Sequence, residues 1–154
     1  MIIFGGYSDN TNRLKSTEII NERGIVSAGP DMPEPNMGHA IASVNETTTI
    51  LTGGQPSVVS SAKTWFFSHV SQQFQAGPIL ITGRRRHASA TIQDKVTMEN
   101  IVAVIGGYGH DDEGTLDTTE LLIHGESEWQ QGKSCEIIKC VSLPLLQVSI
   151  FFLI

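Results

Sequence analysis

A pair of adjacent glycines occurs three times in this chain, each time at the end of a short apolar run. The pairs are Gly5-Gly6, Gly53-Gly54 and Gly106-Gly107, so they are 48 and 53 residues apart. Self-similarity at a period of about 50 residues is typical of folds that repeat one small sheet. This repetition limits what the chain can fold into more than any other feature of the sequence.

Other features recur in step with the glycine pairs. After each pair comes a polar turn, a segment carrying threonine, a segment around one bulky residue and, in two units, a Gly-Pro turn and a histidine. The members are Thr17-Glu18, Thr64-Trp65 and Thr119-Glu120; Val26, Phe74 and Trp129; Gly29-Pro30 and Gly77-Pro78; and His39 and His87. Turn signals between such short segments predict four strands per unit.

The strands before the glycines are apolar almost throughout, which predicts burial on both faces of each sheet. The strand after each histidine carries small residues at alternate positions, Ala40 and Ala42 in one unit and Ala88 and Ala90 in the next. Small side chains suit the innermost strand of sheets that stack around an axis. The sequence therefore predicts an all-β chain of stacked antiparallel sheets.

This order of features resembles the kelch repeat: apolar run, Gly-Gly, polar loop, Thr-Glu strand, aromatic residue with Gly-Pro, and Arg84-x-x-His87. The resemblance covers about residues 1–132 and implies a kelch-type β-propeller fragment with four-stranded antiparallel blades in an incomplete ring. It divides the chain into a partial blade that lacks its inner strand (1–36), two full blades (37–85 and 86–132) and a non-repeat apolar tail (133–154). The first unit departs from the pattern, because Asn36 and Val26 stand where an arginine and an aromatic residue are expected.

The resemblance and the repeated positions imply structural roles for one set of residues. Glycine permits positive φ at a strand end, and a strand rather than a helix follows each pair, so a turn is favoured over a phosphate-binding loop. A histidine with a copy in the next unit is expected to pack or to form hydrogen bonds rather than to catalyse. The structural set is Gly5, Gly6, Gly53, Gly54, Gly106, Gly107, Glu18, Glu120, His39, His87, Arg84 and Trp129.

By the same resemblance, the loops after the glycine pairs and the stretches between units form a rim that binds a partner protein. The loops are residues 7–13, 55–60 and 108–115, joined by 31–37 and 79–86. Tyr7 and Tyr108 either anchor the partner or only cover a sheet edge. The predicted partner-binding residues are Tyr7, Asp9, Asn10, Arg13, Gln55, Arg85, Arg86, Tyr108, His110, Asp111 and Asp112.

The acidic cluster from His110 to Glu113 could be a metal site or a solvated turn. A calcium loop places its oxygen ligands at alternate positions around a central glycine, and this cluster does not. A solvated turn is therefore favoured, and we expect neither a metal nor another cofactor.

The resemblance implies a non-enzymatic protein–protein interaction module, a fragment of a ubiquitin-ligase substrate receptor or of a cytoskeletal scaffold. Two alternatives stay open. One is a metal-dependent propeller enzyme of the copper-oxidase kind, which would need a cysteine beside a rim tyrosine, whereas Cys135 and Cys140 both lie in the tail. The other is a truncated chain without independent function.

Charge and composition further limit the classes of partner and the compartment that we expect. The net charge of −6 argues against nucleic acid, and the absence of a signal peptide favours a cytoplasmic protein with free thiols. The 15-residue apolar run from Cys140 to Ile154 is shorter than the about 20 residues that span a bilayer, so membrane association is not expected. End blades would expose apolar faces, so we expect assembly with other blades or chains. The tail is either a strand donated to an open blade or sequence foreign to the domain.

Overall fold

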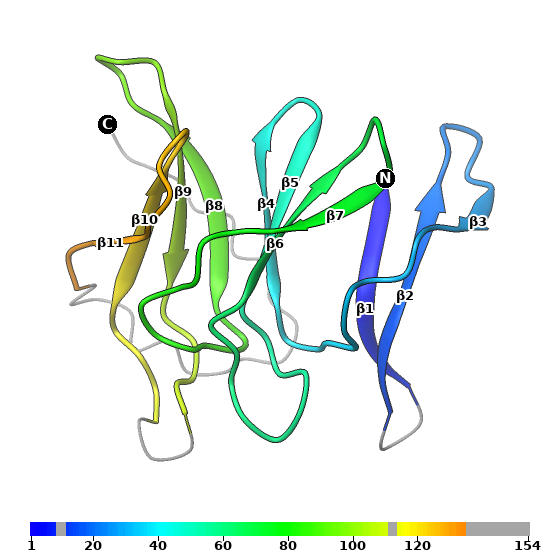
Figure 1. Ribbon diagram of the computed structural model, residues 1–154, viewed down its shortest axis with the longest axis horizontal. Coiled ribbons are helices and arrows are strands. Elements are labelled where there is room, and N and C mark those ends of the chain that lie inside the picture. Colours follow the sequence, from blue (N-terminus) through cyan, green and yellow to red (C-terminus); the bar gives the residue numbers. More distant parts are fainter. Residues whose placement is uncertain (9–11, 111–113, 135–154) are drawn as a thin grey trace.

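The described residues of the chain fold into three antiparallel β-sheets that follow one another along the sequence (Figure 1). The computed structural model describes residues 1–8, 12–110 and 114–134, and no helix occurs within these ranges. The prediction of an all-β chain is confirmed. The first sheet contains three strands in the order β1-β2-β3, namely β1 (Ile2–Ser8), β2 (Asn12–Ile20) and β3 (Val26–Ala28).

The second and third sheets contain four strands each, and their strands are arranged in the same way. In each of them the strand that precedes the glycine pair lies between an alanine-rich strand and the threonine-bearing strand. The second sheet consists of β4 (Ala40–Asn45), β5 (Thr48–Thr52), β6 (Thr64–Ser68) and β7 (Gln73–Ala76); the third consists of β8 (Ala88–Gln93), β9 (Asn100–Ile105), β10 (Thr119–Ile123) and β11 (Gln130–Gln131).

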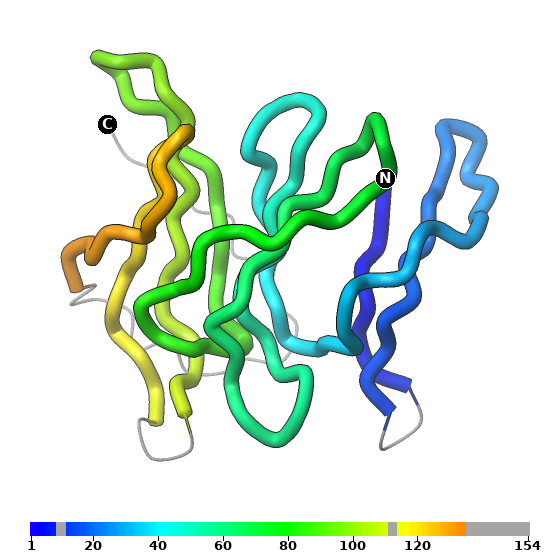
Figure 2. Tube along the Cα trace, viewed as in Figure 1, coloured from blue at the N-terminus to red at the C-terminus, as the bar shows by residue number. Residues whose placement is uncertain are grey.

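The second sheet lies between the other two, and one buried apolar cluster lies on each side of it (Figure 2). We call these clusters the first and second interfaces. The first interface joins Phe4 of β1 and Met32 of the following linker to Leu51 and Phe67 of the second sheet. Its rings meet edge to face, with the centroids of Phe4 and Phe67 5.3 Å apart.

The second interface joins the second and third sheets. It consists of Ala42, Val44, Ile50, Leu80, Val102, Val104, Leu122 and Trp129. The Trp129 indole N–H donates a hydrogen bond of 2.9 Å to the carbonyl of Pro78, which fixes the large ring against the linker.

The continuous apolar runs in the sequence follow from this stacking. Successive side chains of a strand point to opposite faces of its sheet. In β5, Leu51 therefore reaches the first interface while its neighbour Ile50 reaches the second. A strand buried on both faces has no position left for a solvent-facing polar side chain.

Candidate functional site

The glycine pairs end or interrupt the strands that carry them, and all six glycines have positive φ, between 51° and 116°. Four of them, Gly5, Gly53, Gly54 and Gly107, also lie too close to a linker for a side chain. A Cβ atom on Gly107 would stand 2.6 Å from the Arg85 carbonyl oxygen and 2.7 Å from the Cβ of His87. The pairs are therefore needed for backbone geometry and for close approach.

The linkers into the second and third sheets are fastened to the glycine pairs at equivalent positions, Asn36 and Arg84. The Asn36 carbonyl accepts a hydrogen bond from Gly6 N at 3.0 Å, and its side chain donates to the Gly53 carbonyl at 2.8 Å. The Arg84 carbonyl likewise accepts from Gly54 N at 2.8 Å, and its guanidinium donates to the Gly106 carbonyl at 2.9 Å. Each of these residues thus links two successive glycine pairs.

Arg84 also forms a fully buried ion pair with Glu120 of β10, with Nη2 and Oε1 2.5 Å apart. The two carboxylate oxygens of Glu120 accept hydrogen bonds from the backbone N–H groups of Ile81 and Thr82, at 2.7 and 3.0 Å. The pair holds the linker against the third sheet, and the Arg84 charge is not available to a ligand.

The repeated histidines lie beside these linkers. His87 is buried, and its Nε2 is 2.8 Å from the Thr52 hydroxyl in a hydrogen bond. Burial, followed by the nearby charge of Arg84, lowers the pKa of His87 to about 3. Burial also lowers the pKa of His39. The His87 ring is therefore neutral at physiological pH.

In Figure 2 the linkers into β4 and β8 reach these strands at the lower end of the sheets. Residues of these two linkers, of β1 and of the loop after β5 line a pocket of about 470 Å³. We call it the Arg86 pocket. It is lined by Gly6, Tyr7, Met37, Gly38, Gln55, Arg85 and Arg86. Among the described residues that line it there is no aspartate or glutamate but there are two arginines, so this part of its lining is positively charged.

Arg85 is held in place by its neighbours. Its guanidinium donates to the Ser60 hydroxyl at 2.7 Å and to the Gly109 carbonyl at 3.2 Å, and it lies 5.9 Å from the centre of the Tyr108 ring. Its backbone pairs with that of Tyr108 in an isolated antiparallel bridge. Arg85 thus forms a fixed positive wall of the pocket.

Arg86 differs from Arg85 in its exposure and in its side-chain contacts. It is exposed, and within the described ranges its guanidinium has no hydrogen-bond or ion-pair partner. Its φ is +53°, a value that non-glycine residues rarely adopt. The equivalent residue one unit earlier is Gly38, with a φ of +64°, and the Arg86 N–H donates to the Gly38 carbonyl at 2.6 Å. An arginine therefore occupies a position whose backbone favours glycine.

The structure brings four of the predicted partner-binding residues together, because Tyr7, Gln55, Arg85 and Arg86 all line the Arg86 pocket. Tyr108 contacts Arg85, which lines the pocket, and Arg13 is the cross-strand partner of Tyr7. His110 follows Gly109 just beyond the Arg85 contacts. Asp9, Asn10, Asp111 and Asp112 lie outside the described residues, as do Cys135 and Cys140.

The partner-binding residues predicted from the sequence did not include three lining residues, Gly6, Met37 and Gly38, of which Gly6 was assigned a structural role. Gly38 stands one residue before His39, as Arg86 does before His87. The 48-residue spacing therefore indicated that Gly38 is equivalent to the predicted residue Arg86. Met37 lies in the linker stretch that was expected to join the rim.

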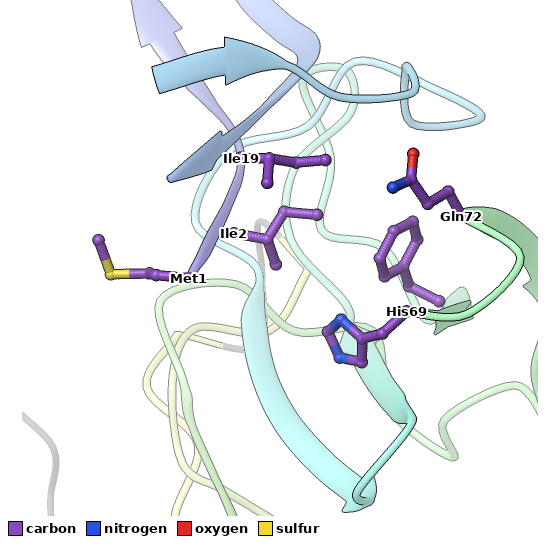
Figure 3. A pocket seen from close by; sticks show the side chains of 6 residues that line it. Met1, Ile2, Ile19, His69 and Gln72 are labelled. Carbon is purple, nitrogen blue, oxygen red and sulfur yellow. The ribbon is translucent and has the colours of Figure 1, made fainter. Parts of the chain in front are cut away.

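A smaller cavity of about 190 Å³ lies between the first sheet and the turn after β6, lined by Met1, Ile2, Ile19, Phe67, His69 and Gln72 (Figure 3). Ile2, Ile19, His69 and Gln72 point toward one another, while the Met1 side chain extends away from them. The His69 ring packs edge to face on Phe67 and shares a hydrogen bond of 2.8 Å with the Thr49 hydroxyl. This cavity adjoins the first interface, and none of the described residues that line it is Asp, Glu, Lys or Arg.

Within the ranges that the structure describes, no group of three or more His, Cys, Asp and Glu side chains could hold a metal ion. No helix in those ranges has the length and apolarity needed to cross a membrane. No known family model matches the chain, and no curated protein matches its sequence.

Proposed function

We propose that this chain is a protein-interaction module built from kelch-type propeller blades, and that its Arg86 pocket binds an acidic peptide segment of a partner protein. The observation that carries the proposal is Arg86 itself. An exposed cation stands in a pocket whose described lining residues include no aspartate or glutamate, on a backbone with a φ of +53°. Strained backbone and an unpaired charge together are typical of residues that act on a ligand.

The rest of the pocket supports a peptide as the ligand. The fixed guanidinium of Arg85 and the free guanidinium of Arg86 can each bind a carboxylate through two parallel hydrogen bonds. Tyr7 is 52% exposed and, with Met37, offers an apolar surface beside the two charges. Tyrosine and arginine are the residue types that most often dominate interface energies. The proposed partner segment therefore presents a carboxylate next to an apolar side chain.

The experiment uses a displayed library of random linear peptides with the full chain as bait. Selected peptides are synthesised, and their affinities for wild type, R86E and R23E are measured by fluorescence anisotropy. Arg23 is the matched control, because it is also an exposed arginine but lies in the turn between β2 and β3. We expect selected peptides enriched in Asp and Glu, a loss of at least about tenfold in R86E, and little change in R23E.

A third variant, R86G, distinguishes a binding role from a structural one. Glycine relieves the strain of positive φ, so R86G should be as stable as wild type or more stable by about 1 kcal/mol. We expect it nevertheless to lose the acidic peptide. Peptides without acidic residues, or equal losses in R86E and R23E, would contradict the proposal.

A further inference from the structure

The first sheet has an unpaired edge at β1. In the other two sheets the strand before the glycine pair is central, because β5 pairs with β4 and β9 pairs with β8. β1 holds the same position in the repeat but pairs with β2 alone among the described strands. An open edge offers its backbone N–H and C=O groups to another extended chain.

The register identifies which groups β1 offers. Met1 and Ile20 exchange two backbone hydrogen bonds, of 2.9 and 2.8 Å. Because such pairs alternate along an antiparallel ladder, the N–H and C=O groups of Ile2 and Phe4 point to the open edge. The residues 48 positions later, Ile50 and Thr52, are the ones that face Ala42 and Ala40 of β4.

A second observation comes from β4, the inner strand of the next sheet. β4 and β8 lie side by side, because the Thr91 hydroxyl donates to the Ser43 carbonyl and the Asn100 side chain donates to the Val44 carbonyl at 2.8 Å. Ser43 stands one period before Thr91, so its own hydroxyl faces the place of an inner strand for the first sheet. Ser43 is exposed, and its hydroxyl makes no hydrogen bond to a described residue; Ile41 on the same face is 45% exposed.

We propose that the edge of β1 binds an extended peptide segment of a partner, which adds antiparallel to Ile2–Phe4 and accepts a hydrogen bond from Ser43. Main-chain hydrogen bonds give affinity in this mode of recognition, and alternate side chains give specificity. The inner strands β4 and β8 carry alanine at alternate positions, so the segment is expected to carry small residues in the same alternation. This site is separate from the Arg86 pocket, and neither proposal depends on the other.

The probe is a synthetic peptide with the sequence of residues 39–45, added to the full chain while amide hydrogen exchange is followed by NMR. We expect exchange at Ile2 and Phe4 to slow by at least about tenfold. The control peptide has the same side chains but is N-methylated at the residues corresponding to Ala40 and Ala42, whose N–H groups should face β1. It should give no protection.

S43A provides a second, independent readout and should weaken the probe peptide about three- to tenfold without changing the circular dichroism spectrum. Unchanged exchange at Ile2 and Phe4 in saturating peptide would overturn the proposal. So would equal binding of the N-methylated peptide. A dimer by sedimentation with both amides already protected would assign the edge to a second copy of the chain instead.

Discussion

Glu18 and Glu120 follow a threonine at the same point of the repeat, but their surroundings are opposite. Glu120 is fully buried against Arg84 and two linker N–H groups. Glu18 is exposed on the face of the first sheet that points away from the second. The sequence placed both residues correctly in the repeat, but only the packing of a preceding linker decides which one forms a buried ion pair.

This difference gives a matched pair of variants. E120A leaves the guanidinium of Arg84 buried without its carboxylate and should lower the free energy of unfolding by about 3–5 kcal/mol. E18A removes an exposed carboxylate and should change it by less than about 0.5 kcal/mol. Urea denaturation of both variants is the measurement. A loss in E120A as small as that in E18A would show that the buried pair contributes nothing.

Neutral His87 makes the stability depend on pH. Its pKa is about 3 in the folded chain and near 6.5 in the unfolded chain, so between these values only the unfolded chain takes up the proton. The free energy of unfolding is therefore highest above pH 6.5 and falls as the pH falls, by about 2 kcal/mol between pH 6.5 and pH 5. Denaturation midpoints measured at pH 7 and at pH 5 should show that H87Q loses less stability on acidification than wild type does.

The control for this prediction is H124Q, which alters an exposed histidine. H124Q should keep the wild-type dependence on pH. If H87Q and H124Q lose stability on acidification to the same extent, the acid sensitivity does not come from His87.

At the scale of elements, the repeat predicted the strands well because each lies between turn signals that recur. Gly-Pro pairs and polar turns mark where chains reverse, and the apolar runs before the glycine pairs mark the central strands. What the sequence could not show is how the linkers close on those pairs. Asn36 donates to the Gly53 carbonyl and Arg84 donates to the equivalent Gly106 carbonyl, although the two side chains differ in length and charge.

The candidate site was predicted only in part for a similar reason. Tyr7, Gln55, Arg85 and Arg86 come from three separate segments, and the recurrence of loops after the glycines was enough to expect them at one end. Backbone torsion angles are not visible in a sequence, so the left-handed conformation of Arg86 could be inferred only from Gly38 at the equivalent position. The same spacing could have revealed it.

A comparison of two glycines distinguishes the effect of backbone strain from the effect of too little space for a side chain. Gly107 and Gly125 have nearly the same φ, 92° and 93°, but a Cβ atom meets Arg85 and His87 only at Gly107 and nothing within 4 Å at Gly125. G125A should therefore show strain alone, about 1–3 kcal/mol. G107A should lose about 1–3 kcal/mol more, from overpacking. Thermal unfolding of both variants is the measurement, and equal losses would show that the linker yields to the added methyl group.

At the scale of the whole molecule, the three described sheets pack against one another through two interfaces. Each sheet therefore buries apolar side chains against at least one neighbouring sheet. Phe4 of the first sheet packs in one apolar cluster with Leu51 and Phe67 of the second sheet. The second sheet also covers Val102 and Val104 of the third sheet. Stacked units whose buried surface lies mostly between neighbours gain stability from those interfaces. We therefore expect the three sheets to fold as one unit.

The most direct test of that claim is thermal unfolding followed by tryptophan fluorescence in single-tryptophan variants. W129F leaves Trp65 to report on the first interface, and W65F leaves Trp129 to report on the second. In each variant we expect the fluorescence transition to coincide with the loss of β-structure by circular dichroism, as one cooperative transition. Separate transitions at the two interfaces, or fluorescence changes without a cooperative loss of β-structure, would contradict the account.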